Sequence, residues 1–312
     1  MTKIAIVGAG MAGLAAARRL AETGIGCTVI EKSRGLGGRM ATRRVDGLQF
    51  DHGAQYFTAR GTGLRSRLAE WQAQGAVAQW TPGRWVGTPG MTAPAWSLAQ
   101  GLRVIRGRRT TGLEGEPGHW RPTTEPGSGN PGDGESFDAV LLAIPAPQVI
   151  PLVASVGVRF PELERVRYAP CLTLMLGFEN TTDVQEYAVT PPEGPVAWIA
   201  RNGTKPGRSG SLETLVVHAN PDWSRQHIDA DPESAAEALL GALRPHIGDA
   251  RPVFRSMHRW LYARVEQTAG TPFLWDPARR IGACGDWAGG PRVEAAFDSG
   301  EALAAAVLET LA

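Results

Sequence analysis

A glycine-rich segment near the start of the chain, GAGMAG at 8–13, restricts the possible folds more than any other feature. It follows a continuous apolar run at 3–7 and precedes a run rich in small residues at 14–23. The apolar run is typical of a buried parallel strand, and the small residues indicate a helix. A second apolar run, 27–30, ends at Glu31. This order of strand, glycine turn, helix, strand and acid predicts a βαβ unit that binds a dinucleotide.

Each part of this unit has a chemical purpose. Gly8 permits the tight turn, Gly10 lets the backbone approach a pyrophosphate, and Gly13 allows the helix to pack closely on the strand. The pyrophosphate is expected at the positive N-terminus of the helix. Glu31 is expected to accept hydrogen bonds from the adenosine ribose, which disfavours a 2′-phosphate and therefore NADP in this site.

Composition excludes several classes of protein. The chain has 312 residues, which suggests one large domain or two ordinary ones, and 32 basic residues balance 31 acidic ones. This balance leaves no field that would attract nucleic acid or an anionic membrane. Three widely spaced cysteines without a CxxC pattern argue against disulfides and metal sites. The longest apolar stretch, 139–158, contains three prolines, and 3–7 is too short for a signal peptide, so a cytoplasmic protein is expected.

The remaining segments divide into two kinds. Helices are expected at 64–74, about 94–100, 232–246 and about 294–311, and a hairpin at 77–87. Strands are expected at 102–106, 118–124, 136–142, 171–178, 196–201, 212–219, 252–260 and 281–286, with a polar loop at 125–135. Polar and apolar residues in the middle of the chain therefore alternate as they do in an antiparallel sheet. The last segment again has the order strand, glycine turn and helix that is found at the beginning.

The fold class predicted from these patterns is α/β plus α+β, with a Rossmann-like cofactor domain and an inserted mixed, mainly antiparallel substrate domain. The cofactor domain is expected to comprise 1–60, 90–150 and 277–312. The substrate domain is expected to comprise 61–89 and 151–276. Whether the chain is a monomer or a homodimer stays open.

Two further motifs distinguish FAD from NAD. KSRGLGGRM at 32–40 resembles the second motif of the amine-oxidase-like FAD proteins of the glutathione-reductase type, which assigns Arg39 to the diphosphate and ribityl region. CGDWAGGPRVEAA at 284–296 resembles the C-terminal flavin motif of the same proteins, which gives Asp286 a similar role. The helix that follows points its N-terminus at the flavin in those proteins, where its dipole stabilises negative charge near N1.

The resemblance implies FAD as the cofactor, held without a covalent bond, because covalent amine oxidases use a cysteine well upstream of this motif. The residues expected to bind FAD are Gly8, Gly10, Met11, Ala12, Gly13, Glu31, Lys32, Gly38, Arg39, Met40, Gly53, Ala54, Gln55, Gly285, Asp286, Arg292, Val293 and Ala295.

A more specific resemblance covers nearly the whole chain. It rests on the segments FDHGAQYFTAR (50–60), ARNGTKPGR (200–208), NPDWSRQHID (220–229), HRWLYA (258–263) and CGDWAGGPRVEAAFDSG (284–300). Together they resemble the short bacterial members of the renalase family. The resemblance implies oxidation of dihydronicotinamide dinucleotides that carry the extra hydride at ring position 2 or 6. Flavin N5 takes the hydride, NAD(P)⁺ leaves, and dioxygen is reduced to hydrogen peroxide.

Such a reaction needs no general base, because a dihydropyridine loses hydride without losing a proton, and positioning suffices. The residues expected to face the substrate or the flavin are Gln55, Tyr56, Trp198, Arg201, Asn202, His258, Trp260 and Tyr262. The last three alternate along a strand, so they share a face and form a candidate aromatic wall for a nicotinamide. Packing in the core is the competing interpretation for each of them.

Other functions remain open. An amine oxidase or a desaturase acting on a hydrophobic substrate would be favoured by an apolar tunnel and a lysine near flavin N5. The chain has three lysines, and only Lys205 suits that position. A flavin-binding module without turnover is the alternative from a different class. A plain NAD dehydrogenase fits least, since Arg39 and Asp286 would then lack a purpose.

Overall fold

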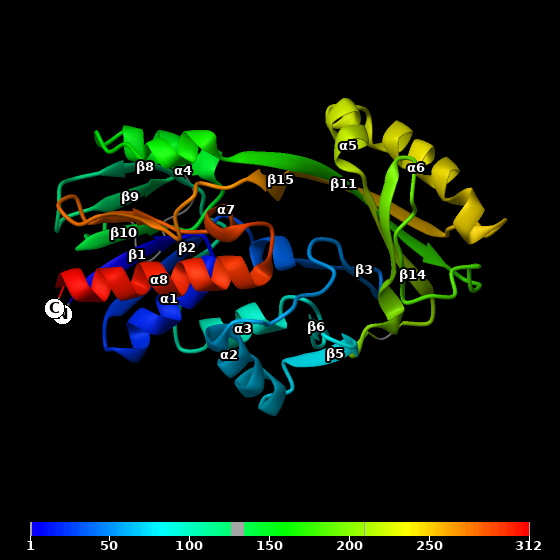
Figure 1. Ribbon diagram of the computed structural model, residues 1–312, viewed down its shortest axis with the longest axis horizontal. Coiled ribbons are helices and arrows are strands. Elements are labelled where there is room, and N and C mark those ends of the chain that lie inside the picture. Colours follow the sequence, from blue (N-terminus) through cyan, green and yellow to red (C-terminus); the bar gives the residue numbers. More distant parts are fainter. Residues whose placement is uncertain (1, 126–133, 209, 312) are drawn as a thin grey trace.

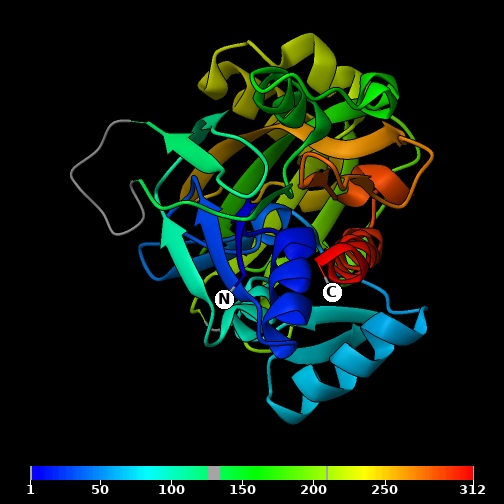
Figure 2. The ribbon, with the colours of Figure 1, turned by 90° about the vertical axis from the view of Figure 1, so that its left-hand side faces the viewer.

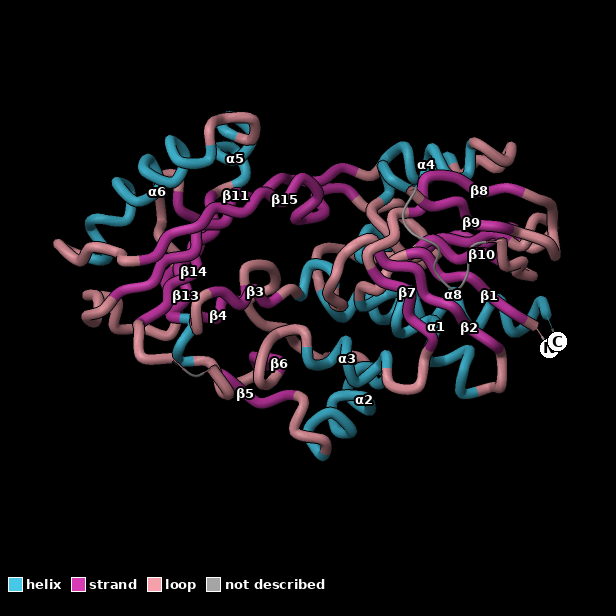
Figure 3. The backbone as a smooth tube through the Cα atoms, turned by 180° about the vertical axis from the view of Figure 1, so that it is seen from behind, coloured by secondary structure: helices cyan, strands magenta, loops and turns pink. Residues whose placement is uncertain are grey.

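Two β-sheets lie towards opposite ends of the molecule, and long strands extend from one towards the other (Figures 1 and 3). We describe a computed structural model of the chain, in which residues 2–125, 134–208 and 210–311 are placed. The first sheet has the strand order β16-β17-β10-β1-β2-β7, and all its pairs are parallel except β16 with β17. Its strands are β1 (Lys3–Val7), β2 (Gly26–Glu31), β7 (Arg103–Arg106), β10 (Ala139–Leu142), β16 (Leu274–Asp276) and β17 (Ile281–Ala283).

Both faces of this sheet are covered, as the apolar run at 3–7 predicts. Ile4 and Ile6 of β1 pack in the core formed with α1 (Met11–Glu22) and α8 (Val293–Leu311), two helices that lie side by side in Figure 2. Ala5 and Val7 point the opposite way. They pack in the core formed with α4 (Ala146–Ala154) and the hairpin of β8 (Thr110–Glu114) and β9 (Arg121–Thr124).

The second sheet is antiparallel and has the order β12-β13-β14-β11-β15. Its strands are β11 (Arg167–Phe178), β12 (Ala188–Val189), β13 (Val196–Arg201), β14 (Glu213–Ala219) and β15 (Phe254–Gln267). Helices α5 (Pro221–His227) and α6 (Pro232–Ile247) cover one face, where Leu174 and Val217 pack against Leu239. Residues that alternate with these, such as Thr173 and His218, therefore occupy the other face.

Shorter elements lie between the strands of these sheets in the chain or after the last of them. They are η1 (Gly38–Met40), β3 (Thr42–Val45), β4 (Leu48–Asp51), α2 (Thr62–Ala73), β5 (Val77–Thr81), β6 (Arg84–Gly87), α3 (Ala93–Ala99), η2 (Pro161–Arg165), η3 (Asn202–Thr204) and α7 (Asp286–Gly289). The fold class expected from the sequence, a Rossmann-like domain combined with a mixed, mainly antiparallel one, is confirmed.

The structure differs from the expected elements in a few places. β11 begins at residue 167 instead of 171, and β15 continues to 267 instead of ending at 260. The hairpin of β3 and β4 and the helix α5 were not expected. Part of the expected polar loop, 126–133, lies outside the described residues.

Two segments pack across the expected domain boundaries. β16 pairs with β17 in the first sheet, although the sequence assigned residue 276 and those before it to the inserted domain. Leu64, Trp71 and Val86 lie within 61–89, which was assigned to the substrate domain, but they share a core with α1 of the cofactor domain. The boundaries themselves stay a prediction.

Candidate functional site

The glycine turn after β1 is built as the sequence predicts. A Cβ at Gly13 would overlap the carbonyl oxygen of Gly8, and one at Gly8 would meet the backbone of Ala143, so both positions require glycine. A Cβ at Gly10 would meet nothing within 4 Å. Gly10 is also the N-cap of α1, and no side chain caps that end of the helix. The positive end of α1, with Met11 in its first turn, therefore borders open space in which an anion fits.

Glu31 ends β2 beside this turn. Its Oε2 accepts a hydrogen bond from the backbone N–H of Ala9 at 2.8 Å, and its Oε1 accepts one from Ser33 at 2.7 Å. These bonds hold a carboxylate that is only 6% exposed next to the glycine turn. The neighbouring Lys32 is exposed.

Arg39 and Asp286 come from opposite ends of the chain and meet in the structure. Two nitrogens of the Arg39 guanidinium donate to the two carboxylate oxygens of Asp286, at 2.7 and 2.6 Å. The backbone N–H of Ala54 donates to the carbonyl of Arg39 at 2.8 Å, and a Cβ at Gly53 would overlap that carbonyl. The segments around Gly38, Gly53 and Asp286 thus form one contiguous surface beside the glycine turn.

The start of α8 completes this surface. Glu294 is buried in the first turn, and its Oε1 accepts hydrogen bonds from the backbone N–H groups of Arg60 and Gly61 at 2.6 and 2.7 Å. Gly285 donates its N–H to Ser299 Oγ at 3.1 Å. The preceding Cys284 is fully buried, and burial raises the pKa of its thiol to about 12.

These residues suit a dinucleotide cofactor. The open space at Gly10 suits a pyrophosphate, Glu31 lies where the ribose is expected, and Arg39 with Asp286 lies between the glycine turn and the second sheet. Of the remaining expected contacts, Ala12 and Met40 are buried, Val293 and Ala295 lie in the first turn of α8, and Arg292 is exposed before it.

A row of four side chains crosses the second sheet on its uncovered face. Strand register pairs Trp198 with His218, His218 with Thr173, and Thr173 with His258. Directly paired residues of antiparallel strands point to the same side. This row, Trp198–His218–Thr173–His258, therefore faces the first domain.

Residues 52–56 pass over that row. The rings of His52 and His258 lie 4.7 Å apart between centroids, and His52 stacks on Trp260 at 5.3 Å. Trp260 donates its indole N–H to the carbonyl of His52 at 3.0 Å. At the other end of the row, Tyr56 lies 6.0 Å from the ring of Trp198. We call His52, Tyr56, Trp198, His258 and Trp260 the aromatic wall.

Beneath the wall lies a buried cluster of charges. Lys205, whose side chain is fully buried, donates to Asp51 Oδ2 at 3.2 Å and to Gln55 Oε1 at 3.1 Å. Arg208 pairs with the same Asp51 oxygen. The amide nitrogen of Gln55 donates to the Asp51 carbonyl at 2.6 Å and lies 3.3 Å from His218 Nε2.

Burial and these charges shift several pKa values. Burial alone would raise the pKa of Asp51, but Lys205 and Arg208 lower it to about 2. Burial lowers the pKa of Lys205 to about 8, even though Asp51 opposes that change. Burial, aided by the neighbouring His258 and Lys205 respectively, lowers the pKa of both His52 and His218 to about 4. Both histidines are therefore neutral near pH 7.

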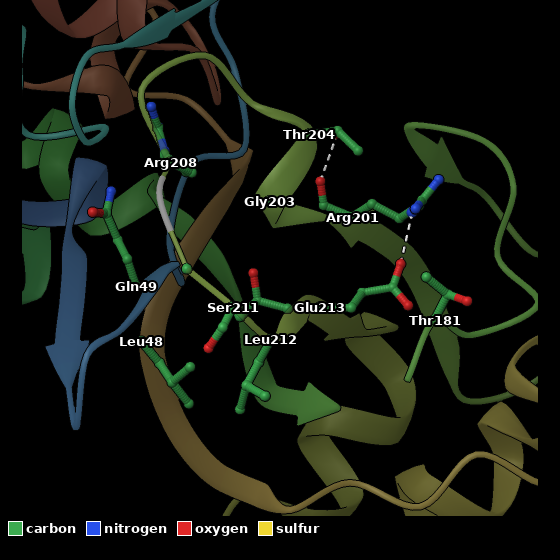
Figure 4. Close-up of a pocket in the computed structure, with 12 residues that line it drawn as sticks. Leu48, Gln49, Thr181, Arg201, Gly203, Thr204, Arg208, Ser211, Leu212 and Glu213 are labelled. Atoms are coloured by element: carbon green, nitrogen blue, oxygen red, sulfur yellow. Dashed lines mark hydrogen bonds and ion pairs between the residues drawn. The ribbon is translucent and has the colours of Figure 1, made fainter. Parts of the chain in front are cut away.

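Three predicted residues lie apart from the aromatic wall. Arg201 pairs with Glu213 at 2.8 Å along a separate cavity of about 320 Å³, as Figure 4 shows. Asn202 donates to the carbonyl of Gln49 at 2.8 Å, so it anchors β4. The ring of Tyr262 packs against Tyr168 at 5.4 Å. The strand-end position expected to aim Arg201 and Asn202 at a substrate instead commits both to protein partners.

Several polar residues of the site were not among the expected ones. They are Asp51, His52, Arg208, His218 and Glu294. Asp51 and His52 stand in the FDHG segment, where a buried acid beside glycine was visible in the sequence. His218 carries little signal, because only the strand register brings it beneath Gln55.

Comparison with known families agrees with this geometry. Residues 6–70 match the model of an NAD(P)-binding Rossmann-like domain. Residues 66–308 match the model of flavin containing amine oxidoreductases, which covers well over half of the chain.

Solved structures share the fold over almost the whole length. A protein from Exiguobacterium sp. 255-15, named provisionally as a protoporphyrinogen oxidase, has a TM-score of 0.77 at 15% identity, with 99% of each chain covered. A double mutant of a putrescine oxidase has a TM-score of 0.76 at 15% identity, again with 99% of each chain covered. A cyclohexylamine oxidase from Brevibacterium oxydans IH-35A has 0.70 at 14% identity, with 99% of each chain covered.

A short local similarity links the chain to a carotenoid enzyme. A 4,4'-diapophytoene desaturase of Staphylococcus aureus (strain Newman) is 51% identical over 51 residues, which are 16% of this chain and 10% of the desaturase. Separately, no helix within the described ranges combines the length and the apolar character that crossing a membrane requires. The family match shows an FAD-dependent oxidoreductase, and the chain belongs to the family of flavin containing amine oxidoreductases.

Proposed function

We propose that this enzyme oxidises dihydro-NAD(P) isomers that carry the extra hydride at position 2 or 6, in the manner of renalase. The observation that carries the proposal is the aromatic wall, which gathers flat rings from residues 52–56, β13 and β15 on one face of the second sheet. A planar nicotinamide stacks well on such rings. The wall faces the domain that holds the cofactor.

The residues of the wall supply position and not acid–base chemistry. Bound FAD supplies a two-electron acceptor, with dioxygen as the expected final acceptor. His52 and His218 are neutral near pH 7, and the Lys205 ammonium is engaged by Asp51 and Gln55. No proton has to leave a dihydropyridine when it loses hydride, so this arrangement suits the reaction.

The cofactor would be held by the residues described above. The α1 N-terminus would bind its pyrophosphate, and Glu31 would accept hydrogen bonds from its ribose. Arg39 is fixed by two hydrogen bonds to Asp286 and one to the carbonyl of Ala263 at 3.3 Å, and its other N–H groups would serve the cofactor's phosphates.

A second candidate function, oxidation of amines, is favoured by one observation. Lys205 is fully buried directly beneath Gln55, and burial lowers its pKa to about 8. A lysine of this kind near flavin is what an amine oxidase would be expected to have. The experiment below separates the two functions.

The test is to mix the purified yellow protein with possible donors in the absence of oxygen. The donors are borohydride-made dihydronicotinamide isomers, ordinary NADH and a panel of primary amines. Bleaching of the flavin by an isomer alone, reversed by air with formation of peroxide, is the expected result. Bleaching by amines alone would contradict the proposal and support the second candidate.

A variant tests the wall itself. Trp260→Ala removes the ring on which His52 stacks, so reduction of the flavin by an isomer should slow by about tenfold or more. Trp223→Ala serves as a control, since it removes an indole from the opposite face of the same sheet. An unchanged reduction rate in Trp260→Ala would show that Trp260 only packs.

A further inference from the structure

One arginine lies against the aromatic wall. Arg84 begins β6, directly after the turn of the hairpin formed with β5. Its guanidinium carbon is 4.6 Å from the centroid of the Tyr56 ring and 5.6 Å from that of Trp198. The guanidinium therefore lies within cation–π distance of both rings.

Among the described residues, Arg84 lacks the acidic partner that several other arginines have. Arg67 pairs with Glu22 and Glu70, and Arg225 pairs with Asp222 and Glu266. Within 2–125, 134–208 and 210–311, no acidic side chain pairs with Arg84. Its N–H groups are therefore available to an anion from outside the protein.

A second donor lies at the same place. The indole N–H of Trp198 is buried, and no hydrogen-bond partner for it occurs in the described part of the chain. A buried donor without a partner costs stability, which a ligand oxygen would restore. Arg84 and Trp198 together thus offer donors to a ligand that is rich in acceptors.

The charge balance behind the wall points the same way. Lys205 and Arg208 share the single carboxylate of Asp51, which leaves one positive charge of that cluster uncompensated. Arg84 adds another on the wall itself. An ammonium ion would be repelled here and an anion attracted, because charges interact strongly where water is largely excluded.

We propose that Arg84 and the indole N–H of Trp198 bind a phosphate group of the substrate, so that the enzyme selects phosphorylated dihydronicotinamides over amines. This inference rests on the proposed function. The nicotinamide ring lies against the His52 and Trp260 end of the wall, and its phosphate reaches the Tyr56 and Trp198 end. Arg84 acts as a binding residue that sets specificity and takes no part in hydride transfer.

The test compares three donors with the same reactive ring, namely the 6-dihydro isomers of nicotinamide riboside, nicotinamide mononucleotide and NAD. They carry no phosphate, one phosphate and a diphosphate. Arg84→Gln should lower the second-order rate constant of anaerobic flavin reduction about tenfold or more for both phosphorylated donors. The riboside should change less than twofold, and Arg84→Lys should recover most of the loss.

Arg159→Gln is the matched control. It removes the same charge from an exposed arginine that pairs with Glu164, so all three donors should react as with the wild-type protein. An equal loss for the riboside and the phosphorylated donors in Arg84→Gln would show a structural role and overturn the inference. Unchanged rates for all donors would overturn it as well.

A binding measurement keeps this test separate from that of the proposed function. NAD⁺ is titrated into wild-type protein and Arg84→Gln while tryptophan fluorescence is followed. Weaker binding of about tenfold in the variant supports the phosphate site even if no dihydronicotinamide bleaches the flavin, which would end the proposed reaction only. Equal binding, or no binding to the wild type, overturns the phosphate site even if the isomers do bleach the flavin.

Discussion

Two glycines of the first turn, only three residues apart, have opposite surroundings and give a paired prediction. Gly10→Val places its side chain in open space, so the free energy of unfolding of the apoprotein should change by less than about 1 kcal/mol. FAD affinity should fall by about tenfold or more, because the side chain fills the space expected for the pyrophosphate. Gly13→Ala should instead destabilise the apoprotein by about 1–3 kcal/mol, since its Cβ overlaps the Gly8 carbonyl.

Thermal unfolding of both apoproteins and fluorescence titration with FAD measure these effects. Unchanged FAD affinity in Gly10→Val would contradict the assignment of this space to the cofactor.

The buried histidines make stability depend on pH. His52 and His218 have pKa values of about 4 in the folded protein against 6.5 when exposed, so the unfolded chain binds more protons between these values. The free energy of unfolding should therefore fall as the pH falls from about 6.5 to 4, with a slope approaching about 1.4 kcal/mol per pH unit for each histidine. Asp51, with a pKa of about 2, adds a loss only below about pH 4.

Urea unfolding at pH 7, 6 and 5 measures this slope. His218→Asn should reduce the slope clearly but not abolish it, because one buried ring is gone while His52 and His258, whose pKa values burial also lowers, remain. A slope that His218→Asn leaves unchanged would mean that His218 is not buried neutral.

At this scale the geometry of the glycine turn could be predicted from the sequence, whereas the partners of some substrate-side candidates could not. Gly8, Gly13 and Glu31 follow from local spacing, because strand, turn and helix fix their positions. Arg201 was expected to face a substrate, but it pairs with Glu213, a residue of the neighbouring strand that no local pattern connects with it.

Two glycines within helices, one in α8 and one in α6, differ in how closely they are packed. Gly300 of α8 lies against the backbone of Ala12 in α1, and a Cβ there would overlap the Ala12 carbonyl. Gly300→Ala should push the two helices apart and destabilise the protein by about 1–3 kcal/mol. Gly241 in α6 is exposed and has open space around it, so Gly241→Ala should stabilise the protein by about 0.5–1 kcal/mol.

Denaturant unfolding of the two variants checks both signs. A stable Gly300→Ala protein with normal flavin content would show that α1 and α8 can separate without cost.

The lengths of β11 and β15 were underestimated from the sequence, for a physical reason. At 258–262 the alternation of aromatic residues marks a strand, but at 264–267 every side chain except that of Val265 is exposed. Pairing with β11 continues through two register shifts, so tertiary contacts and not local pattern extend these strands.

At the scale of the whole molecule, the two sheets should unfold together. β11 and β15 belong to the second sheet, yet Val265 of β15 packs in the core of the first domain. Leu239→Ala, in the core beneath α6, should lower the free energy of unfolding by about 2–4 kcal/mol. Unfolding should still occur in a single transition. FAD at a concentration one hundred times its dissociation constant should raise the free energy of unfolding by about 2.7 kcal/mol.

Circular dichroism and flavin release, followed in the same thermal scan, would measure this. Release of flavin well before the loss of ellipticity would contradict a single cooperative unit.

The meeting of α1 and α8 has a consequence for biosynthesis. Gly10 and Glu31 leave the ribosome long before Asp286 and α8, because most strands of the two sheets lie between them in the chain. At translation rates of about 5–20 residues per second, the cofactor surface stays incomplete for on the order of ten seconds or more. Flavin is thus captured only by chains that have been translated past the start of α8, and yellow colour in a cell extract reports only such chains.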